Sequence, residues 1–270
     1  MNLPLQNTIR KYGTITLTNL QNQLAYAWDA ASRSVMIMLF MFIFVQLWTA
    51  VYENKGTSTI AGLTLANTIW YFLFAEMVEL GKFRHDQTIS DEVKDGSIAY
   101  TLVRPYNYLA YHFANGLGET AVKMVLIFLL GAPVALYFAG WPTVYLPGLP
   151  ATLLVLLLGL LIDFLHGQHD WADGLCDGRH FFAAAHLPEA NLHSGRAAHP
   201  GGFLPGWLQT IARVLPFNLT TYAPAKLFVA FSWSQFGQLL AWQIGWLALL
   251  SLLLWRQYRW ASRRLAVNGG

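Results

Sequence analysis

The residues best suited to metal chemistry gather in one stretch, residues 166–202. This stretch holds six of the eight histidines and the only cysteine of the chain. His166, His169, Cys176 and His180 offer the nitrogen and thiolate ligands that zinc prefers. Their spacing matches no standard zinc finger, so a metal site is one of three interpretations of this stretch.

The other two interpretations are a polar loop and a frame-shifted segment. No window of residues 166–202 is apolar enough to cross a bilayer. A polar loop on either side of the membrane explains this simply. We favour a frame shift, because codons compatible with these residues, read one nucleotide later, permit a peptide that is apolar at both ends. The nucleotide sequence encoding residues 160–208 is the direct test.

A second group of candidate residues is the charged run between residues 89 and 105. Thr88 and Asp91 have the spacing of a capping box, which places acidic side chains in the first turn of a short helix. Gly96 can end that helix in a left-handed conformation, and Pro105 opposes a helical continuation. We predict a short, charged, rigid projection that could pair with a soluble partner; a solvated loop is the alternative.

The chain lacks the sequence needed to bind and hydrolyse ATP. It contains no G-x-x-x-x-G-K-[ST] loop to hold phosphates. The pair Gly81-Lys82 has neither the preceding glycine-rich turn nor the following hydroxyl residue. We therefore expect no catalytic or cofactor-binding residues in this chain, and, because we favour a frame shift over a zinc site for residues 166–202, no metal-binding residues either.

The composition indicates an all-α polytopic membrane protein. Hydrophobic residues make up 55% of the chain and charged residues only 11%, against roughly 25% charged residues in ordinary soluble domains. The eleven tryptophans suit the two membrane interfaces. We attribute the net charge of +3 to cytoplasmic loops rather than to a nucleic-acid partner, and we expect the lipid bilayer to surround most of the chain.

Five apolar segments are long enough, or nearly so, to cross a hydrocarbon core about 30 Å thick. They are residues 35–51, 60–80, 121–140, 149–165 and 236–255. Lys and Arg are frequent before the first segment, between the second and third, and after the last, which places both termini in the cytoplasm. Five crossings cannot return the C-terminus to that side, so one further crossing is needed between residues 166 and 235.

The N-terminal 33 residues are expected to form an interfacial helix. Leu17, Leu20, Leu24, Ala27 and Trp28 recur at helical spacing, which is typical of an amphipathic helix on a membrane surface. An ordinary solvated leader is the alternative.

Residues 203–233 are apolar but contain Pro205, Pro216 and Pro224, so they cannot form one straight helix. We expect short helices that dip into the outer leaflet, because broken backbone at membrane depth must be shielded by protein.

Ionisable residues lie near the ends of the apolar segments. Glu76 and Glu79 share one helix face, Glu119 and Lys123 are spaced to pair, and Asp163 lies near an inner end. Charged groups within membranes are functional candidates, but near an end their cost is small. We interpret these as structural or interfacial residues.

The charged loop, from Ile89 to Arg104-Pro105, resembles that of the ABC-2 type transporter permeases, in particular a six-span branch of uncharacterised cargo. The segments 203–209, 215–217 and 222–224 are similar to a second region of the same family. The resemblance covers nearly the whole chain except residues 166–202 as written.

The resemblance implies a permease domain over residues 1–265, a six-span helical bundle whose fifth span is scrambled as written. It implies a multi-pass protein of the inner (plasma) membrane that pairs with a second permease, identical or homologous, and with an ABC ATP-binding subunit that carries ATP and Mg. Residues 81–115 would form the ATPase-coupling loop, with Asp91, Glu92, Lys94, Asp95, Gly96, Tyr100, Arg104 and Pro105. Residues 203–233 would form the outer gate on the export path, with Pro205, Gly206, Trp207, Pro216, Phe217, Tyr222 and Pro224.

Two other functions remain open from the sequence. An inverted repeat, or a charged site at the membrane midplane, would favour an ion-gradient-driven secondary transporter. Neither feature is evident in the sequence. A non-transporting membrane scaffold is the other.

Overall fold

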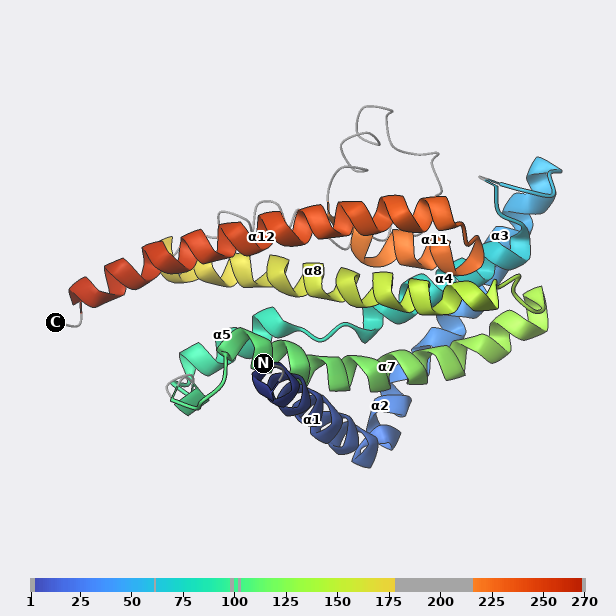
Figure 1. The fold of residues 1–270 in the computed structure, drawn as a ribbon. Coiled ribbons are helices and arrows are strands. Elements are labelled where there is room, and N and C mark those ends of the chain that lie inside the picture. The colour runs from blue at the N-terminus through green and yellow to red at the C-terminus, as the bar shows by residue number, and fades with distance from the viewer. Residues whose placement is uncertain (1–2, 61, 98–99, 102, 178–215, 269–270) are drawn as a thin grey trace.

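The computed structural model describes residues 3–60, 62–97, 100–101, 103–177 and 216–268. Within them the chain is helical and forms no strand, apart from an isolated bridge between Ile60 and Leu63. The long helices lie side by side as a bundle (Figure 1). The α-helices of the described chain are α1 (Leu3–Ala25), α2 (Ala27–Ser34), α3 (Met36–Lys55), α4 (Leu65–Gly81), α5 (His85–Lys94), α7 (Tyr108–Ala139), α8 (Leu149–Asp177), α11 (Ala223–Val229) and α12 (Trp233–Asn268).

Four segments of the described chain are long and apolar enough to cross a membrane: Met36–Lys55, Tyr108–Ala139, Leu146–Gln168 and Trp233–Gln257. They include four of the five predicted segments, and the helices at the third and fifth begin earlier than expected. The remaining predicted segment becomes α4, which has 17 residues and a length of about 25 Å. Six spans are therefore not confirmed.

The centre of the bundle is α4. Its residues from Thr68 to Ala75 are all buried, and they pack against α3, α7 and α11. Gly131 of α7 allows this approach, because a Cβ atom there would overlap the side chain of Leu73. Small residues at helix contacts let backbones come close in membranes, where water does not drive helices together. The sequence marks α4 only by its hydropathy; its central place follows from packing.

Helices α8 and α12 form the second packed layer and run in the same direction (Figure 1). Buried Gln243 of α12 joins them, because its side-chain nitrogen donates to the carbonyl of Val155 at 2.9 Å and to that of Leu219 at 3.0 Å. A buried amide is costly unless it is hydrogen-bonded. Gln243 thus fixes the register of α12 against α8 and the π-helical turn Asn218–Tyr222.

Residues 216–232 are broken, as predicted, into the π-helical turn and α11. Their position differs from the prediction. The Thr221 hydroxyl donates to Glu79 near the end of α4, whereas the Val229 carbonyl lies 3.5 Å from the Asn67 amide near its beginning. This stretch therefore runs along most of α4 instead of lying only at one end of the bundle.

The path of residues 216–229 bears on whether the chain crosses the membrane an odd or an even number of times. The end of α8 and the beginning of α12 lie at opposite ends of the bundle (Figure 1). In the described chain, part of the return between those ends is made by residues 216–229. Of the predicted frame-shifted segment, residues 166–177 continue α8, and the rest lies outside the described residues.

Residues 3–34 form two helices, with a break at Tyr26, rather than the single helix predicted over the N-terminal 33 residues. Helix α1 packs across the first half of α7 (Figure 1). Leu20 lies in that contact, whereas Leu17, Leu24 and Trp28 are exposed, Trp28 by 90%. The helical prediction is confirmed, and the exposed apolar side chains suit a membrane surface.

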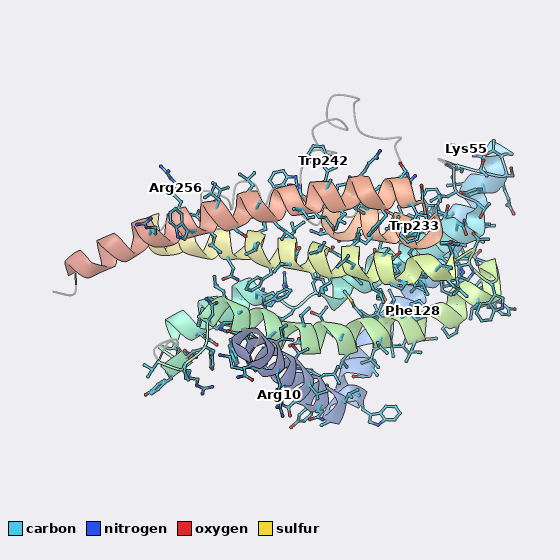
Figure 2. All side chains as sticks on the ribbon, in the orientation of Figure 1. Arg10, Lys55, Phe128, Trp233, Trp242 and Arg256 are labelled. Carbon is cyan, nitrogen blue, oxygen red and sulfur yellow. The ribbon has the colours of Figure 1, made fainter. Side chains whose placement is uncertain are left out.

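Two exposed tryptophans lie near the ends of the apolar part of α12, Trp233–Gln257. Trp233 and Trp255 are more than half exposed. The 22 residues between their positions correspond to about 33 Å along a helix, close to the thickness of a hydrocarbon core. Figure 2 shows Trp233 and Lys55 at one end of the bundle and Arg256 toward the other. Trp233 and Trp255 have the spacing of two interfacial belts, whereas Trp242, which is also exposed, lies between them.

Candidate functional site

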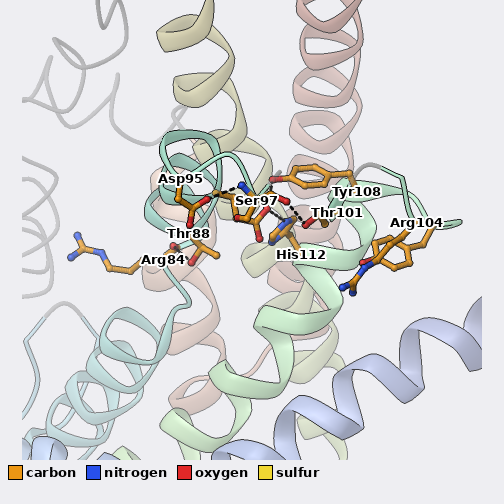
Figure 3. A network of polar contacts seen from close by, with 10 residues as sticks. Arg84, Thr88, Asp95, Ser97, Thr101, Arg104, Tyr108 and His112 are labelled. Atoms are coloured by element: carbon orange, nitrogen blue, oxygen red, sulfur yellow. Dashed lines mark hydrogen bonds and ion pairs between the residues drawn. The ribbon is translucent and has the colours of Figure 1, made fainter. Parts of the chain in front are cut away.

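The predicted coupling loop lies at the end of the bundle where α7 begins (Figures 1 and 3). Helix α5 ends at Lys94, and Gly96 has a φ of 78°, the left-handed conformation predicted for it. The carboxylate of Asp95 accepts a hydrogen bond of 2.9 Å from the backbone N–H of Ser97, which holds the pKa of Asp95 below its usual value. Sequence reasoning therefore located the end of this helix correctly.

The beginning of the helix was predicted wrongly. Helix α5 starts at His85, and Thr88 lies inside it. The Thr88 hydroxyl donates to the carbonyl of Arg84 at 3.3 Å, so it does not cap an N-terminus. A Ser or Thr inside a helix makes this kind of bond to the preceding turn, and the capping-box spacing alone could not distinguish the two cases.

Glu92 holds α5 against α7. Its carboxylate accepts a hydrogen bond of 2.9 Å from the Tyr108 hydroxyl and lies 3.3 Å from Nε2 of His112 (Figure 3). The Glu92 side chain is 21% exposed and that of His112 only 2%. The structure therefore places Glu92 in an internal contact rather than on the surface.

The exposed tip of the loop consists of Asp95, Gly96, Tyr100, Val103, Arg104 and Pro105. Tyr100 is 78% exposed and Val103 87%. The Arg104 guanidinium donates to the Tyr106 hydroxyl at 3.2 Å (Figure 3). Asp91 is exposed on α5, and Lys94 ends that helix. The tip thus combines two large uncovered apolar side chains with a cation.

Helix α1 is hydrogen-bonded to the C-terminal part of the charged loop. The sequence did not indicate this contact. Lys11 donates to the carbonyl of Pro105 at 3.2 Å, and the Tyr12 hydroxyl accepts from the backbone N–H of Asn107 at 3.1 Å. Further along, the Thr16 hydroxyl donates to the Ala114 carbonyl at 2.8 Å. The position of the tip is therefore coupled to that of α1.

An ionic cluster joins α4 to α8 beneath the loop. The Lys82 ammonium lies 3.0 Å from both Glu79 and Asp163. Burial lowers the pKa of Lys82, but the two carboxylates together raise it above its usual range. The sequence identified Glu79 and Asp163 as end charges; their shared partner follows from the tertiary structure.

His85, the first residue of α5, is packed between Phe83 and Phe164, at ring-centre distances of 4.6 and 4.5 Å. Burial, and secondarily the nearby His112, lower its pKa from 6.5 to about 3. Because the unfolded chain then binds a proton more readily than the folded one, stability is complete above pH 6.5 and falls as the pH drops toward 3.

We expect acidification from pH 7 to pH 5 to destabilise the protein by up to about 2 kcal/mol through this histidine. The variant His85→Phe should show a smaller fall in melting temperature over this range than the wild type. Equal falls in the two proteins would contradict the assignment. The melting temperature of the detergent-solubilised chain, measured at both pH values, is the readout.

The predicted gate residues lie partly outside the described chain, since Pro205, Gly206 and Trp207 fall there. Pro216 and Pro224 are buried. Phe217 and Tyr222 contact rings of α8 and α4, those of His166 and Tyr71, at ring-centre distances of 5.0 and 5.7 Å. The described gate residues therefore lie within the bundle. They are separate from the exposed tip of the charged loop.

Of the four residues considered as zinc ligands, only His166 has a side chain that the structure describes. No group of three His, Cys, Asp or Glu side chains suited to a metal ion occurs among the described residues. His180 lies outside them.

The helices and their apolar faces define a multi-pass membrane protein. Residues 33–166 match the family model described as ABC-2 family transporter protein. Through this region the chain belongs to the ABC-2 type permeases, as the resemblance of the charged loop predicted. No curated protein and no solved structure matches the chain.

The family match covers the first four of the predicted membrane segments and stops at the start of the His-rich stretch. It includes α3, α4, α5, the exposed tip and α7, and it ends at residue 166, where the His-rich stretch begins. The frame-shift interpretation of residues 166–202 stays a prediction that the coding sequence can test.

Proposed function

We propose that this chain is the permease subunit of an ATP-driven ABC exporter, and that it forms the translocation path. Members of the matched family are transmembrane subunits and not themselves ATPases. ATP and Mg would be held by a separate ATP-binding subunit, and a second permease, identical or homologous, would complete the path. The absence of a phosphate-binding loop from the full sequence supports this division of labour.

The exposed tip carries the proposal. It lies at the end of the bundle where α7 begins, with Tyr100 and Val103 uncovered, and the exposed Arg104 follows Val103 in the chain. Aromatic residues and arginine are enriched where protein partners bind tightly. Glu92 and α1 brace the tip against α7, so a force applied to it would be transmitted to a membrane-spanning helix. We infer that the ATP-binding subunit docks here.

The orientation follows from the same assignment. Arg256 and α5 lie toward one end of the bundle, whereas Lys55 lies at the other (Figure 2). With the tip facing the cytoplasm, the α5 end is the cytoplasmic one, in agreement with the positive-inside rule. The protein would then reside in the inner (plasma) membrane with both termini in the cytoplasm.

We expect the double variant Tyr100→Ala/Arg104→Ala to lose the ATP-binding subunit. The interaction should weaken by on the order of 2 kcal/mol or more, roughly thirtyfold, because large aromatic and arginine anchors dominate such contacts. The measurement is the amount of ATPase subunit, and of ATP hydrolysis, that co-purifies with the tagged permease from membranes.

The matched control is Lys55→Ala/Tyr137→Ala, which removes an exposed cation and an aromatic ring at other positions of the bundle. It should retain the ATPase. Equal recovery with the tip variant would exclude the tip as the docking site. If no ATP-binding subunit accompanies the wild-type chain, the exporter proposal itself fails.

A further inference from the structure

A cavity of about 640 Å³ lies between the α1–α2 pair and helices α3, α4 and α7. This volume falls within the range of roughly 300–1,000 Å³ that is typical of small-molecule sites. It is bordered by the first turns of α3 and by the last turns of α4, so it occupies the half of the bundle nearer the exposed tip. Neither the docking of an ATPase nor the packing of the bundle requires it.

One wall of the cavity is apolar. Met36, Leu39, Phe40 and Ile43 line it from α3. Met36, Leu39 and Ile43 are more than half exposed, so this wall is not covered by other described helices. An occupant could therefore lay an apolar body against α3.

The opposite side of the cavity is acidic. Asp29, Glu76 and Glu119 line it together with one cation, Lys123. The Lys123 ammonium lies 2.6 Å from Glu119 and neutralises that carboxylate. Glu76 has no hydrogen-bond or ion-pair partner among the residues that the structure describes. Three acidic side chains and one basic side chain thus line the cavity, and Glu76 is the acid without a described partner.

We propose that this cavity binds an amphiphile with a cationic head and an apolar body, the head at Glu76 and the body along α3. A half-buried carboxylate without a partner carries a desolvation cost, and a cation of the ligand would offset that cost. An anionic head would be repelled by the acidic side. The proposal rests on the proposed function only in one respect: it names the class of cargo that the exporter would carry.

Tetraphenylphosphonium is the probe that tests this, because it joins a positive charge to a bulky apolar body. We expect saturable equilibrium binding of the labelled ion to the purified chain in phosphatidylglycerol nanodiscs, without any ATPase. Glu76→Gln should weaken that binding by on the order of tenfold. Labelled tetraphenylborate, which has the same shape and the opposite charge, should show no saturable binding when it is measured by itself.

Two further variants keep the test decisive. Glu53→Gln makes the same change at an exposed position that does not line the cavity, and it should bind as the wild type does. Leu39→Trp fills the apolar wall while Glu76 stays in place, and it should also weaken binding. The proposal would be overturned by no saturable binding of tetraphenylphosphonium, by saturable binding of tetraphenylborate alone, or by unchanged binding to both Glu76→Gln and Leu39→Trp.

Nanodiscs that contain phosphatidylethanolamine separate the two sources of such a ligand. A small-molecule cargo site keeps its affinity for tetraphenylphosphonium in them. A marked loss of affinity would assign the cavity to a lipid headgroup and would overturn the cargo assignment. Binding is measured without the ATPase, so a negative result here leaves the co-purification result at the tip intact, and the reverse also holds.

Discussion

The variant Gly118→Val should detach α1 from α7. A Cβ atom at Gly118 would lie 2.6 Å from the carbonyl oxygen of Thr16 and 2.8 Å from the backbone nitrogen of Leu20. These are backbone atoms of α1, which cannot move aside without moving the whole helix. Overpacking costs about 1–3 kcal/mol where side chains can adjust, and here the hydrogen bonds from Thr16 and Asn19 to α7 would be lost as well.

Disulfide cross-linking measures this displacement directly. Asn19 donates to Asn115 at 2.9 Å, so cysteines at these two positions should cross-link in a chain whose Cys176 is replaced by alanine. We expect the yield to fall severalfold when Gly118→Val is added. Gly245→Val is the matched control, because nothing lies within 4 Å of a Cβ atom there. Undiminished cross-linking would show that α1 tolerates the added bulk.

Because α1 also braces the exposed tip through Lys11 and Tyr12, the same variant should reduce the recovery of the ATP-binding subunit. This effect would be indirect, since Gly118 lies in the helix contact and not at the tip. Loss of cross-linking with full recovery of the ATPase would separate the position of α1 from docking.

The second large effect is expected from Lys82→Met. This change removes the cation that Glu79 and Asp163 share, each at 3.0 Å. Removing one partner of a buried ion pair costs about 3–5 kcal/mol. The two carboxylates here are 37% and 35% exposed, so solvent would reduce the cost to about 2 kcal/mol or more. The midpoint of thermal unfolding in detergent should fall accordingly.

The reciprocal changes test the cause. If uncompensated negative charge destabilises Lys82→Met, then adding Glu79→Gln and Asp163→Asn should restore part of the lost stability. Lys55→Met, at an exposed position, serves as the control for loss of a cation. A triple variant no more stable than Lys82→Met would mean that the lysine contributes by packing rather than by charge.

The sequence predicted correctly those properties that depend on residues close together in the chain. Hydropathy located the membrane helices, because a helix in lipid must be apolar along a fixed length. Gly96 ended α5 as predicted, since the left-handed conformation is a local preference. The spacing of Glu119 and Lys123 predicted their pairing on one face of α7. The charged loop identified the family, which the match over residues 33–166 confirmed.

The sequence failed where a residue has two local possibilities and a distant partner decides between them. Thr88 could cap a helix or lie within one, and α5 started a turn earlier than its spacing suggested. Glu92 looked like a surface charge until the fold placed Tyr108 and His112 beside it. The proline-containing stretch after residue 215 looked like an outer re-entrant loop, but Thr221 and Asn67 show that it follows α4.

The sequence by itself thus determined that the chain is an α-helical membrane protein, where its apolar helices lie, and to which family it belongs. Each of these follows from residues close together in the chain. The tertiary structure alone decided that α4 is the centre, that Lys82 joins α4 to α8, and that α1 braces the exposed tip. It also decided that Glu76 faces a cavity beside α3. These contacts join residues far apart in the chain, and their geometry is set by how the helices pack rather than by any local preference.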